Sequence, residues 1–305
     1  MTFRAKNLSY VFESGRLSLV ELLSATIAKF DPALVQEYAD LLFVALFMVL
    51  ANDDSTKCRE AAAELVKSLY VLSEKSMREA TITRLHTWAA QGNTLRRTAA
   101  HVIGLFVVES GADVALVMLT NLNNILITSA SALADAEASW SDGDAFNEPD
   151  PARLDWRLAY HALSAILKVF HVKSDAVKNP TLVHWGAVNS HLVFPHAWVR
   201  LAVTRLISTL CGGFPLALPD PQLTSSHPLS QDGLVDLAHN LCVQLRSPHL
   251  DNTLSLQVVN SLKQGCREPH AVAILLTVVP SSSCTSRAAK PQTSSEVYEH
   301  HDGYL

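Results

Sequence analysis

Apolar residues recur along this chain at helical spacing, and one short pattern returns four times. Each copy has an arginine, an alanine two positions later, and apolar residues at the sixth and tenth positions. The copies begin at Arg59, Arg97, Arg157 and Arg200, and a looser match begins at Arg16. Offsets of three, six or seven, and ten place side chains on one face of an α-helix. The pattern therefore predicts a repeated amphipathic helix.

The spacing of these arginines indicates the type of repeat. Successive arginines are 43, 38, 60 and 43 residues apart. The longest interval contains Ser131–Asp150, a polar stretch of 20 residues without a clear helical pattern, and without it that interval also falls near 40. A HEAT or armadillo unit has roughly 40–47 residues. We therefore expect an all-α protein, a HEAT/armadillo-like α-solenoid of about eleven helices in antiparallel pairs.

Apolar segments between the arginine-led helices predict the partner helix of each unit. They are Leu34–Leu50, Met77–Gln91, Gly111–Ala130, Thr181–Val193, Gly233–Leu245 and Asp251–Gln264. Asp53 and Asp54 precede a predicted helix, where capping and the helix dipole favour acidic residues, and Ser55 suits the N-cap. Pro195 is expected to begin a helix, where its missing N–H costs little.

The same pattern divides the chain into segments. We expect HEAT-like repeats at 1–130, an acidic disordered insert at 131–152, HEAT-like repeats at 153–213, a proline-rich connector at 214–230, a terminal helix pair at 231–264 and a divergent, largely disordered tail at 265–305. The end repeats carry no obvious polar cap, so we expect an isolated chain to expose apolar surface. Either the chain is a piece of a longer solenoid, or its first helix caps the stack.

Composition narrows the function classes. The net charge is -5, so no global basic field indicates a nucleic-acid binder. The five cysteines are dispersed and never form C-x-x-C, which is typical of reduced thiols inside cells. The N-terminus lacks the apolar segment of a signal peptide. The apolar run Leu41–Ala51 is shorter than the ~20 residues that span a bilayer, so no membrane partner is expected.

The sequence carries no recognisable enzyme motif. G-x-S-x-G, H-E-x-x-H, G-x-x-x-x-G-K and G-x-G-x-x-G are all absent. We therefore predict no catalytic residue, no cofactor and no small-molecule substrate. The thiols of Cys266 and Cys284 and the imidazoles of His270, His300 and His301 are potential zinc ligands, but their spacing fits no known ligand framework. No metal site is predicted.

Six residues are candidates for a structural or partner-binding role. They are Arg59, Arg97, Arg157, Arg200, Trp140 and Phe146. The arginines either bond carboxylates and helix ends along the turns between repeats, as a ladder, or line a concave surface that grips RNA phosphate. The two aromatic residues lie in the acidic insert. They would anchor it if it docks on a basic partner, and the alternative is a solvated loop.

Four stretches in a fixed order carry a family resemblance. They are Ala51–Arg59 with Val66–Leu69; Trp88 with Leu95–Arg97 and Gly104–Glu109; His191–Leu192 with Pro195–Val199; and Leu254–Asn260. Together they resemble the C-terminal region of the DRIM (down-regulated in metastasis) family, also called the U-three small nucleolar RNA-associated protein twenty family. The resemblance spans roughly residues 15–262. Its more specific pieces are NDDS-x-x-C and PH-x-WV.

The resemblance implies a non-catalytic scaffold in ribosome biogenesis, located in the nucleus and nucleolus. That family is a HEAT-repeat component of the small-subunit processome and supports early processing of small-subunit pre-ribosomal RNA. The implied partners are processome proteins, with pre-ribosomal or small nucleolar RNA as part of the particle. The chain is far shorter than the family, which implies a C-terminal fragment or an abbreviated gene model. Periodicity alone also permits a HEAT-repeat adaptor of nuclear transport or of a kinase or phosphatase.

Overall fold

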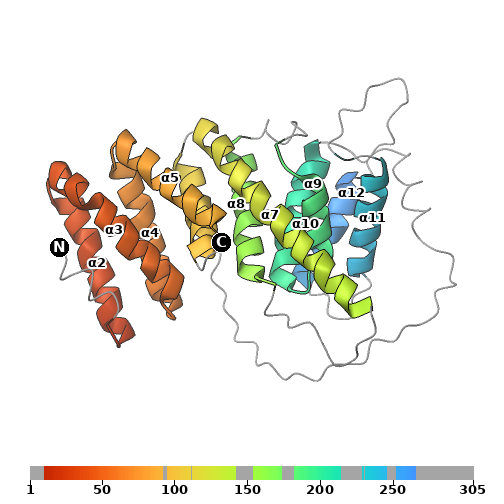
Figure 1. Cartoon of the computed structure of the whole chain (residues 1–305), viewed down its shortest axis with the longest axis horizontal. Coiled ribbons are helices and arrows are strands. Elements are labelled where there is room, and N and C mark those ends of the chain that lie inside the picture. The colour runs from red at the N-terminus through yellow and green to blue at the C-terminus, as the bar shows by residue number, and fades with distance from the viewer. Residues whose placement is uncertain are drawn as a thin grey trace.

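The computed structural model describes residues 10–91, 95–110, 112–141, 154–173, 182–213, 229, 231–245 and 252–265. These ranges contain eleven α-helices and one short 3-10 helix, with no strand among them. The helices alternate between two packed layers along the length of the molecule (Figure 1). The predicted all-α, HEAT/armadillo-like solenoid is confirmed.

The two layers divide the helices by their order in each pair. The first layer holds α3 (Pro32–Asn52), α5 (Lys75–Ala90), α7 (Ala112–Ser141), α9 (Trp185–Ser190) with the 3-10 helix η4 (His191–Val193), and α11 (Gln231–Leu245). The second layer holds α2 (Glu13–Lys29), α4 (Thr56–Leu72), α6 (Leu95–Glu109), α8 (Trp156–Val172), α10 (Ala197–Gly213) and α12 (Asn252–Gly265). Each first-layer helix packs on the second-layer helix that follows it, and neighbouring second-layer helices pack on one another.

The core is continuous because apolar stripes from both layers meet along the stack. Its aromatic centre lies where α3, α5 and α6 converge. The rings of Phe43 and Phe47 lie 5.7 Å apart, and Phe47 contacts Trp88 and Phe106 at 5.9 and 6.5 Å. At the start of α3, the side chain of Asp31 accepts from the Ala33 amide at 2.8 Å, as expected of an N-cap before a proline.

Small residues let the second-layer helices approach closely. The alanines two positions after the repeat arginines include Ala99, Ala159 and Ala202, and each is at most 5% exposed. Gly104 lies so near α8 that a Cβ added there would sit 3.3 Å from the Cβ of Ala165. The alanine of the sequence pattern thus has a packing role, because it brings neighbouring backbones together.

Helix α7 is longer than predicted. The apolar pattern predicts a helix that ends near Ala130, followed by Ser131–Asp150 without a clear helical pattern, but α7 continues through Ser141. Alanine, leucine and glutamate after position 130 are strong helix formers, and no glycine or proline interrupts them. Leu133 continues the buried stripe of Met118, Leu122 and Leu126 at helical spacing. Ser131, Ala132, Ala134 and Asp135, on the other sides of the helix, are exposed.

Two predicted boundaries near α9 were also wrong. Thr181–Val193 was expected as one helix, but α9 begins only at Trp185 and gives way to η4. Asn123 of α7 holds the preceding turn, since its side chain donates to the Leu182 carbonyl (2.6 Å) and accepts from the His184 amide (3.0 Å). The next helix begins at Ala197 rather than at Pro195. Phe194 is extended (ψ 139°), the conformation that a following proline favours.

Several predicted segments fall outside the described residues. They are the rest of the acidic insert after Ser141 up to 152, nearly all of the connector at 214–230, and the tail after Gly265. Their predicted boundaries and disorder stay predictions.

Two helices are long and apolar enough to cross a membrane by length and composition, Pro32–Asn52 and Val114–Ala136. Both are core helices of this solenoid. The first buries eight apolar side chains, and the second buries Met118, Leu119 and Leu122 against its neighbours.

Candidate functional site

The repeat arginines lie in the first turn of the second-layer helices, and three of them make the same contact. Nη1 of Arg16 donates to the carbonyl oxygens six and five residues earlier, at 2.9 and 3.0 Å. Arg59 repeats this contact at 2.7 and 3.0 Å, and Arg200 repeats it at 2.8 and 2.6 Å. Each side chain folds back over the turn before its helix. These are the helix-end bonds that the ladder interpretation requires.

Arg16 also joins α2 to the turn before α4. Its Nε and Nη2 donate to the two carboxylate oxygens of Asp53 at 2.8 and 3.0 Å, and Nη2 reaches Asp54 at 2.7 Å. The side chain of Asp53 is 3% exposed, whereas that of Asp54 is 91% exposed. A buried, two-point arginine–carboxylate pair is both stronger and more directional than an exposed one. Asp53 is therefore the main acceptor at this junction.

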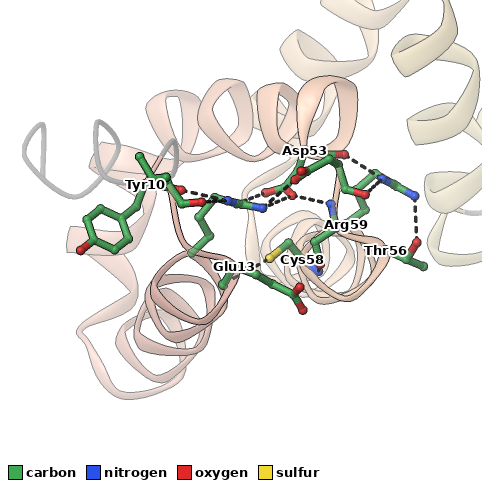
Figure 2. Close-up of polar contacts among 10 residues, drawn as sticks. Tyr10, Glu13, Asp53, Thr56, Cys58 and Arg59 are labelled. Atoms are coloured by element: carbon green, nitrogen blue, oxygen red, sulfur yellow. Dashed lines mark hydrogen bonds and ion pairs between the residues drawn. The ribbon is translucent and has the colours of Figure 1, made fainter.

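The Asp53 carboxylate organises the start of α4 as well (Figure 2). It accepts from the Ser55 amide at 2.8 Å, and Ser55 in turn caps the helix by accepting from the Cys58 amide at 3.3 Å. The Cys58 thiol donates to the Glu13 carbonyl of α2 at 3.8 Å. Burial raises the pKa of Asp53, but the hydrogen bonds from Arg16 and Ser55 outweigh it and hold that pKa below its usual value.

A second carboxylate joins α6 to α8. Nε of Arg97 donates to both carboxylate oxygens of Asp155, at 3.1 and 3.2 Å, and its Nη2 lies 3.0 Å from one of them. Asp155 is also the N-cap of α8 and accepts from the Leu158 amide at 3.1 Å. This pair is more exposed than the Arg16–Asp53 pair, at 45% for Arg97 and 37% for Asp155. Part of the Arg97 guanidinium is therefore open to other partners.

Two histidines stack one helical turn further along these helices. The rings of His101 and His161 lie 4.4 Å apart and nearly parallel, at 17°. Burial, with Lys168 and Arg59 nearby, lowers the pKa of His101 to about 4. Burial, with His101 and the neighbouring cations, also lowers the pKa of His161. Both rings are therefore neutral at pH 7, which a close parallel stack requires.

Lys168 completes this junction. Its ammonium donates to the Gly104 carbonyl of α6 at 3.1 Å, so a charged side chain of α8 crosses the gap where the two helices approach most closely. Burial, followed by repulsion from Lys67 of α4, lowers the pKa of Lys168. The ammonium groups of Lys67 on α4 and Lys168 on α8 are therefore near enough to repel each other.

Aromatic rings, in place of ions, join α8 to α10. Trp156 stacks on His196 at 3.8 Å and 4°, and the Arg157 guanidinium lies 5.2 Å from the Trp156 ring centre. One turn further, Tyr160 meets the edge of Trp198 at 6.1 Å. Trp198 is 44% exposed. This junction leaves an indole and a guanidinium at the surface.

The two most specific sequence motifs thus lie at equivalent places, in turns before second-layer helices. NDDS supplies the acceptor for Arg16 and the cap of α4. PH-x-WV supplies the His196 ring, whose Nδ1 also accepts from the Trp198 amide at 3.3 Å, and the fully buried Val199. Both motifs are therefore explained by how consecutive repeats join.

The sequence does not reveal the acceptors of the arginines. The predicted N-cap Ser55 is confirmed, whereas Asp53, expected to act through capping and the helix dipole, binds Arg16 with its carboxylate. Asp155 and Lys168 are not among the predicted site residues. Asp155 has a recognisable signal, since an aspartate before an apolar helix predicts an N-cap.

The two aromatic candidates of the acidic insert are not placed by the structure. Trp140 belongs to α7, but its side chain is outside the described part, as is the whole of Phe146. No group of three or more His, Cys, Asp or Glu side chains within the described ranges is arranged to hold a metal ion.

The stacked helix pairs and their repeated arginine turns define the class of protein, a HEAT/armadillo-like α-solenoid. A comparison with models of known protein families finds no match. Among solved structures, a designed armadillo repeat protein is 11% identical with a TM-score of 0.44, covering 86% of this chain and 98% of its own. Kap121p is 14% identical with a TM-score of 0.33, covering 90% and 34%. These scores are low, so the fold class depends on the helices themselves.

Two curated relatives match most of the chain. The chain is 31% identical over 278 residues to U3 small nucleolar RNA-associated protein 20 of Schizosaccharomyces pombe, which covers 86% of this chain and 10% of the relative. The Saccharomyces cerevisiae protein of the same name is 27% identical over 214 residues, 68% of this chain and 8% of the relative. The chain spans about a tenth of the length of these proteins. It is homologous to a segment of the U3 small nucleolar RNA-associated protein 20 family, and the sequence resemblance is confirmed.

Proposed function

We propose that this chain is a non-catalytic scaffold in ribosome biogenesis and part of the small-subunit processome, where it supports early processing of small-subunit pre-ribosomal RNA. One observation carries the proposal. The similarity to U3 small nucleolar RNA-associated protein 20 extends over 86% of the chain, and so over the greater part of the solenoid. Similarity of that extent supports a shared mode of assembly and not merely a shared fold.

The site geometry is compatible with a scaffold. The best-defined polar contacts join one repeat to the next, as in Arg16–Asp53 and Arg97–Asp155. Such contacts fix the curvature of a solenoid, and an extended solenoid surface is suited to hold several partners at once. Processome proteins are the proposed partners, with pre-ribosomal and small nucleolar RNA in the same particle, and the nucleolus is the proposed location.

The test is co-purification. A tagged copy of the full chain is expressed in cells, recovered under mild salt, and the associated RNA is probed for U3 small nucleolar RNA and small-subunit precursors. We expect both to be enriched, together with nucleolar localisation of the tagged chain. Recovery with import cargo or with phosphatase or kinase subunits, and without these RNAs, would contradict the proposal and favour an adaptor of another pathway.

Phe106→Ala is a suitable control for that experiment. Phe106 is fully buried and contacts Phe47 and Tyr70, so its loss should destabilise the solenoid without changing the charge of the surface. Enrichment that survives in this variant to the same degree would indicate that the tag or an unfolded chain, and not the solenoid, recovers the RNA.

A further inference from the structure

Charge is divided between the two layers in the C-terminal half of the solenoid. The second-layer helices α6, α8, α10 and α12 contain seven lysines and arginines and one acidic residue, Glu109. The first-layer helices α7, α9 and α11 contain five acidic residues and no lysine or arginine. The net charge of -5 for the whole chain conceals this division. One layer of this half is basic and the other acidic.

The basic residues and two aromatic residues lie on three neighbouring helices, α6, α8 and α10. We define the basic face as Arg97 of α6, Arg157, Tyr160 and Lys168 of α8, and Trp198 and Arg205 of α10. Arg157 and Lys168 are eleven residues apart and Trp198 and Arg205 are seven apart, so each pair lies on one side of its helix. Contacts across the helices join these stripes, through Arg97–Asp155, Lys168–Gly104 and Tyr160–Trp198.

The arginines on and near this face differ in how much of each guanidinium is already hydrogen-bonded within the chain. Arg200 is turned toward the carbonyls of its own turn and so lies outside the face. Arg97 is half exposed beside Asp155, and Arg157 and Arg205 are exposed. Within α8 and α10 there is no acidic side chain to neutralise them. Positive charge at this face is therefore available to an anionic partner.

We propose that the basic face binds single-stranded RNA. Exposed arginines next to the exposed indole of Trp198 match the two features of such a strand, because cations bind phosphate and rings stack on unpaired bases. A peptide of acidic residues would use the cations, but its carboxylate side chains offer no aromatic ring to stack on the indole of Trp198, which is 44% exposed. In a duplex the bases are already stacked on one another and cannot reach that ring. Charge and aromatic exposure together favour a single strand.

This inference goes beyond the proposed function, since it concerns a surface of the chain itself. Binding of RNA by the purified chain leaves the identity of the particle open, and recovery of particles from cells leaves direct RNA contact open. The failure of one is therefore distinguishable from the failure of the other.

The test is fluorescence anisotropy with the full chain and a labelled, mixed-sequence 20-nucleotide single-stranded RNA, in 50 to 200 mM KCl. A duplex of the same sequence and a polyglutamate peptide are compared in parallel. The variant Arg157→Gln with Arg205→Gln should bind on the order of tenfold more weakly at 50 mM. Its plot of log affinity against log salt should be shallower by about 1.4, at about 0.7 for each lost phosphate contact.

Trp198→Ala separates stacking from charge. It should weaken single-stranded RNA binding by on the order of tenfold and leave the salt slope unchanged. The matched control is Lys29→Gln with Lys75→Gln, which removes two exposed positive charges from α2 and α5 and should leave binding near that of the original chain. Circular dichroism checks that every variant is folded.

Three results would overturn the proposal. The first is no binding of single-stranded RNA at 50 mM KCl. The second is an equal loss of affinity in the arginine variant and the lysine control, which would indicate unspecific attraction. The third is polyglutamate binding as tightly as RNA, with no effect of Trp198→Ala, which would indicate an acidic protein partner.

Discussion

The α2–α4 junction and the α8–α10 junction occupy equivalent places in the solenoid, but different chemistry holds each of them. At the first, Arg16 binds the buried Asp53 carboxylate, and the guanidinium has little exposure left. At the second, Trp156 stacks on His196, and Arg157 remains exposed at its side. In the α2–α4 junction the arginine charge is paired with a buried carboxylate, whereas in the α8–α10 junction the arginine charge stays exposed to solvent.

The α6–α8 junction lies between these two in character. It has both an ion pair, Arg97–Asp155, that is more exposed than Arg16–Asp53, and a ring stack, His101–His161. The repeat pattern therefore fixes where an arginine stands, whereas its partner differs from junction to junction. This variation allows the same sequence pattern to engage its arginine in a buried ion pair at one junction and to leave it exposed at another.

The largest expected effect is at the charged junction. Asp53→Ala removes the acceptor of Arg16 and of the Ser55 amide, and should lower the free energy of unfolding by about 2–3 kcal/mol. Urea denaturation followed by circular dichroism measures it. Asp54→Ala is the matched control, since that side chain is 91% exposed and its loss should change stability by less than about 0.5 kcal/mol. Equal effects of the two substitutions would contradict the assigned role of Asp53.

Acidification should act on the middle junction. The folded-state pKa of His101 is about 4, below the 6.5 of an unfolded histidine, so the unfolded chain binds more protons between these values. Stability from the neutral ring is fully present above pH 6.5 and is lost as the pH falls toward 4. The expected loss from His101 between pH 7 and 4.5 is about 2 kcal/mol, since each unit of pKa difference is worth about 1.4 kcal/mol.

Replacing both rings with phenylalanine isolates this effect. His101→Phe with His161→Phe keeps two stacked rings and removes their titration, so the decline in stability with acid should become shallower by at least the amount given for His101, because His161 also has a lowered pKa. Other histidines with lowered pKa values, such as His191 and His196, still titrate and account for the remaining slope. If the variant and the original chain lose stability in parallel, the stack does not carry the pH dependence.

The sequence predicted the positions of the arginines but not their acceptors. The pattern of arginine, alanine and apolar residues is local, so it is visible within one helix. Asp53 lies 37 residues from Arg16, and Asp155 lies 58 residues from Arg97. Separations of that size depend on how long the intervening helices and turns are, and α7 was predicted too short. The acceptors can therefore be identified only in the assembled stack, where these distant residues lie side by side.

The net charge of the whole chain does not reveal the basic face. The net charge of -5 argues against a nucleic-acid binder, but that sum combines a basic layer with an acidic one. Assigning each helix to its layer would have separated the two charges. That assignment was within reach of the sequence, because the alternation of first and second helices was predicted correctly.

A smaller decrease in the free energy of unfolding is expected at the α8–α10 junction. Trp156 is only partly buried, so Trp156→Ala should cost about 1–1.5 kcal/mol, below the 3–5 kcal/mol of a fully buried tryptophan. Trp156→Phe is the control, since it keeps a ring against His196 and should retain most of that stability. Denaturation curves of the two variants measure the loss of stability. An equal loss in Trp156→Phe and Trp156→Ala would argue against ring stacking as the origin of that stability.

The smallest expected effect is the salt dependence of the two substitutions. It distinguishes the ion pair of the α2–α4 junction from the ring stack of the α8–α10 junction. Raising NaCl from 0.1 to 1 M shortens the Debye length from about 10 to about 3 Å, which screens ion pairs that reach solvent and leaves ring stacking intact. The destabilisation by Asp53→Ala should therefore shrink at high salt, though only in part, because its carboxylate is 3% exposed. The destabilisation by Trp156→Ala should stay constant or grow, since high salt does not weaken apolar contact. Each comparison uses the difference between variant and original chain at the same salt, so general salt effects cancel. A parallel response of both variants would mean that Arg16–Asp53 stabilises the turn through its hydrogen-bond geometry more than through charge.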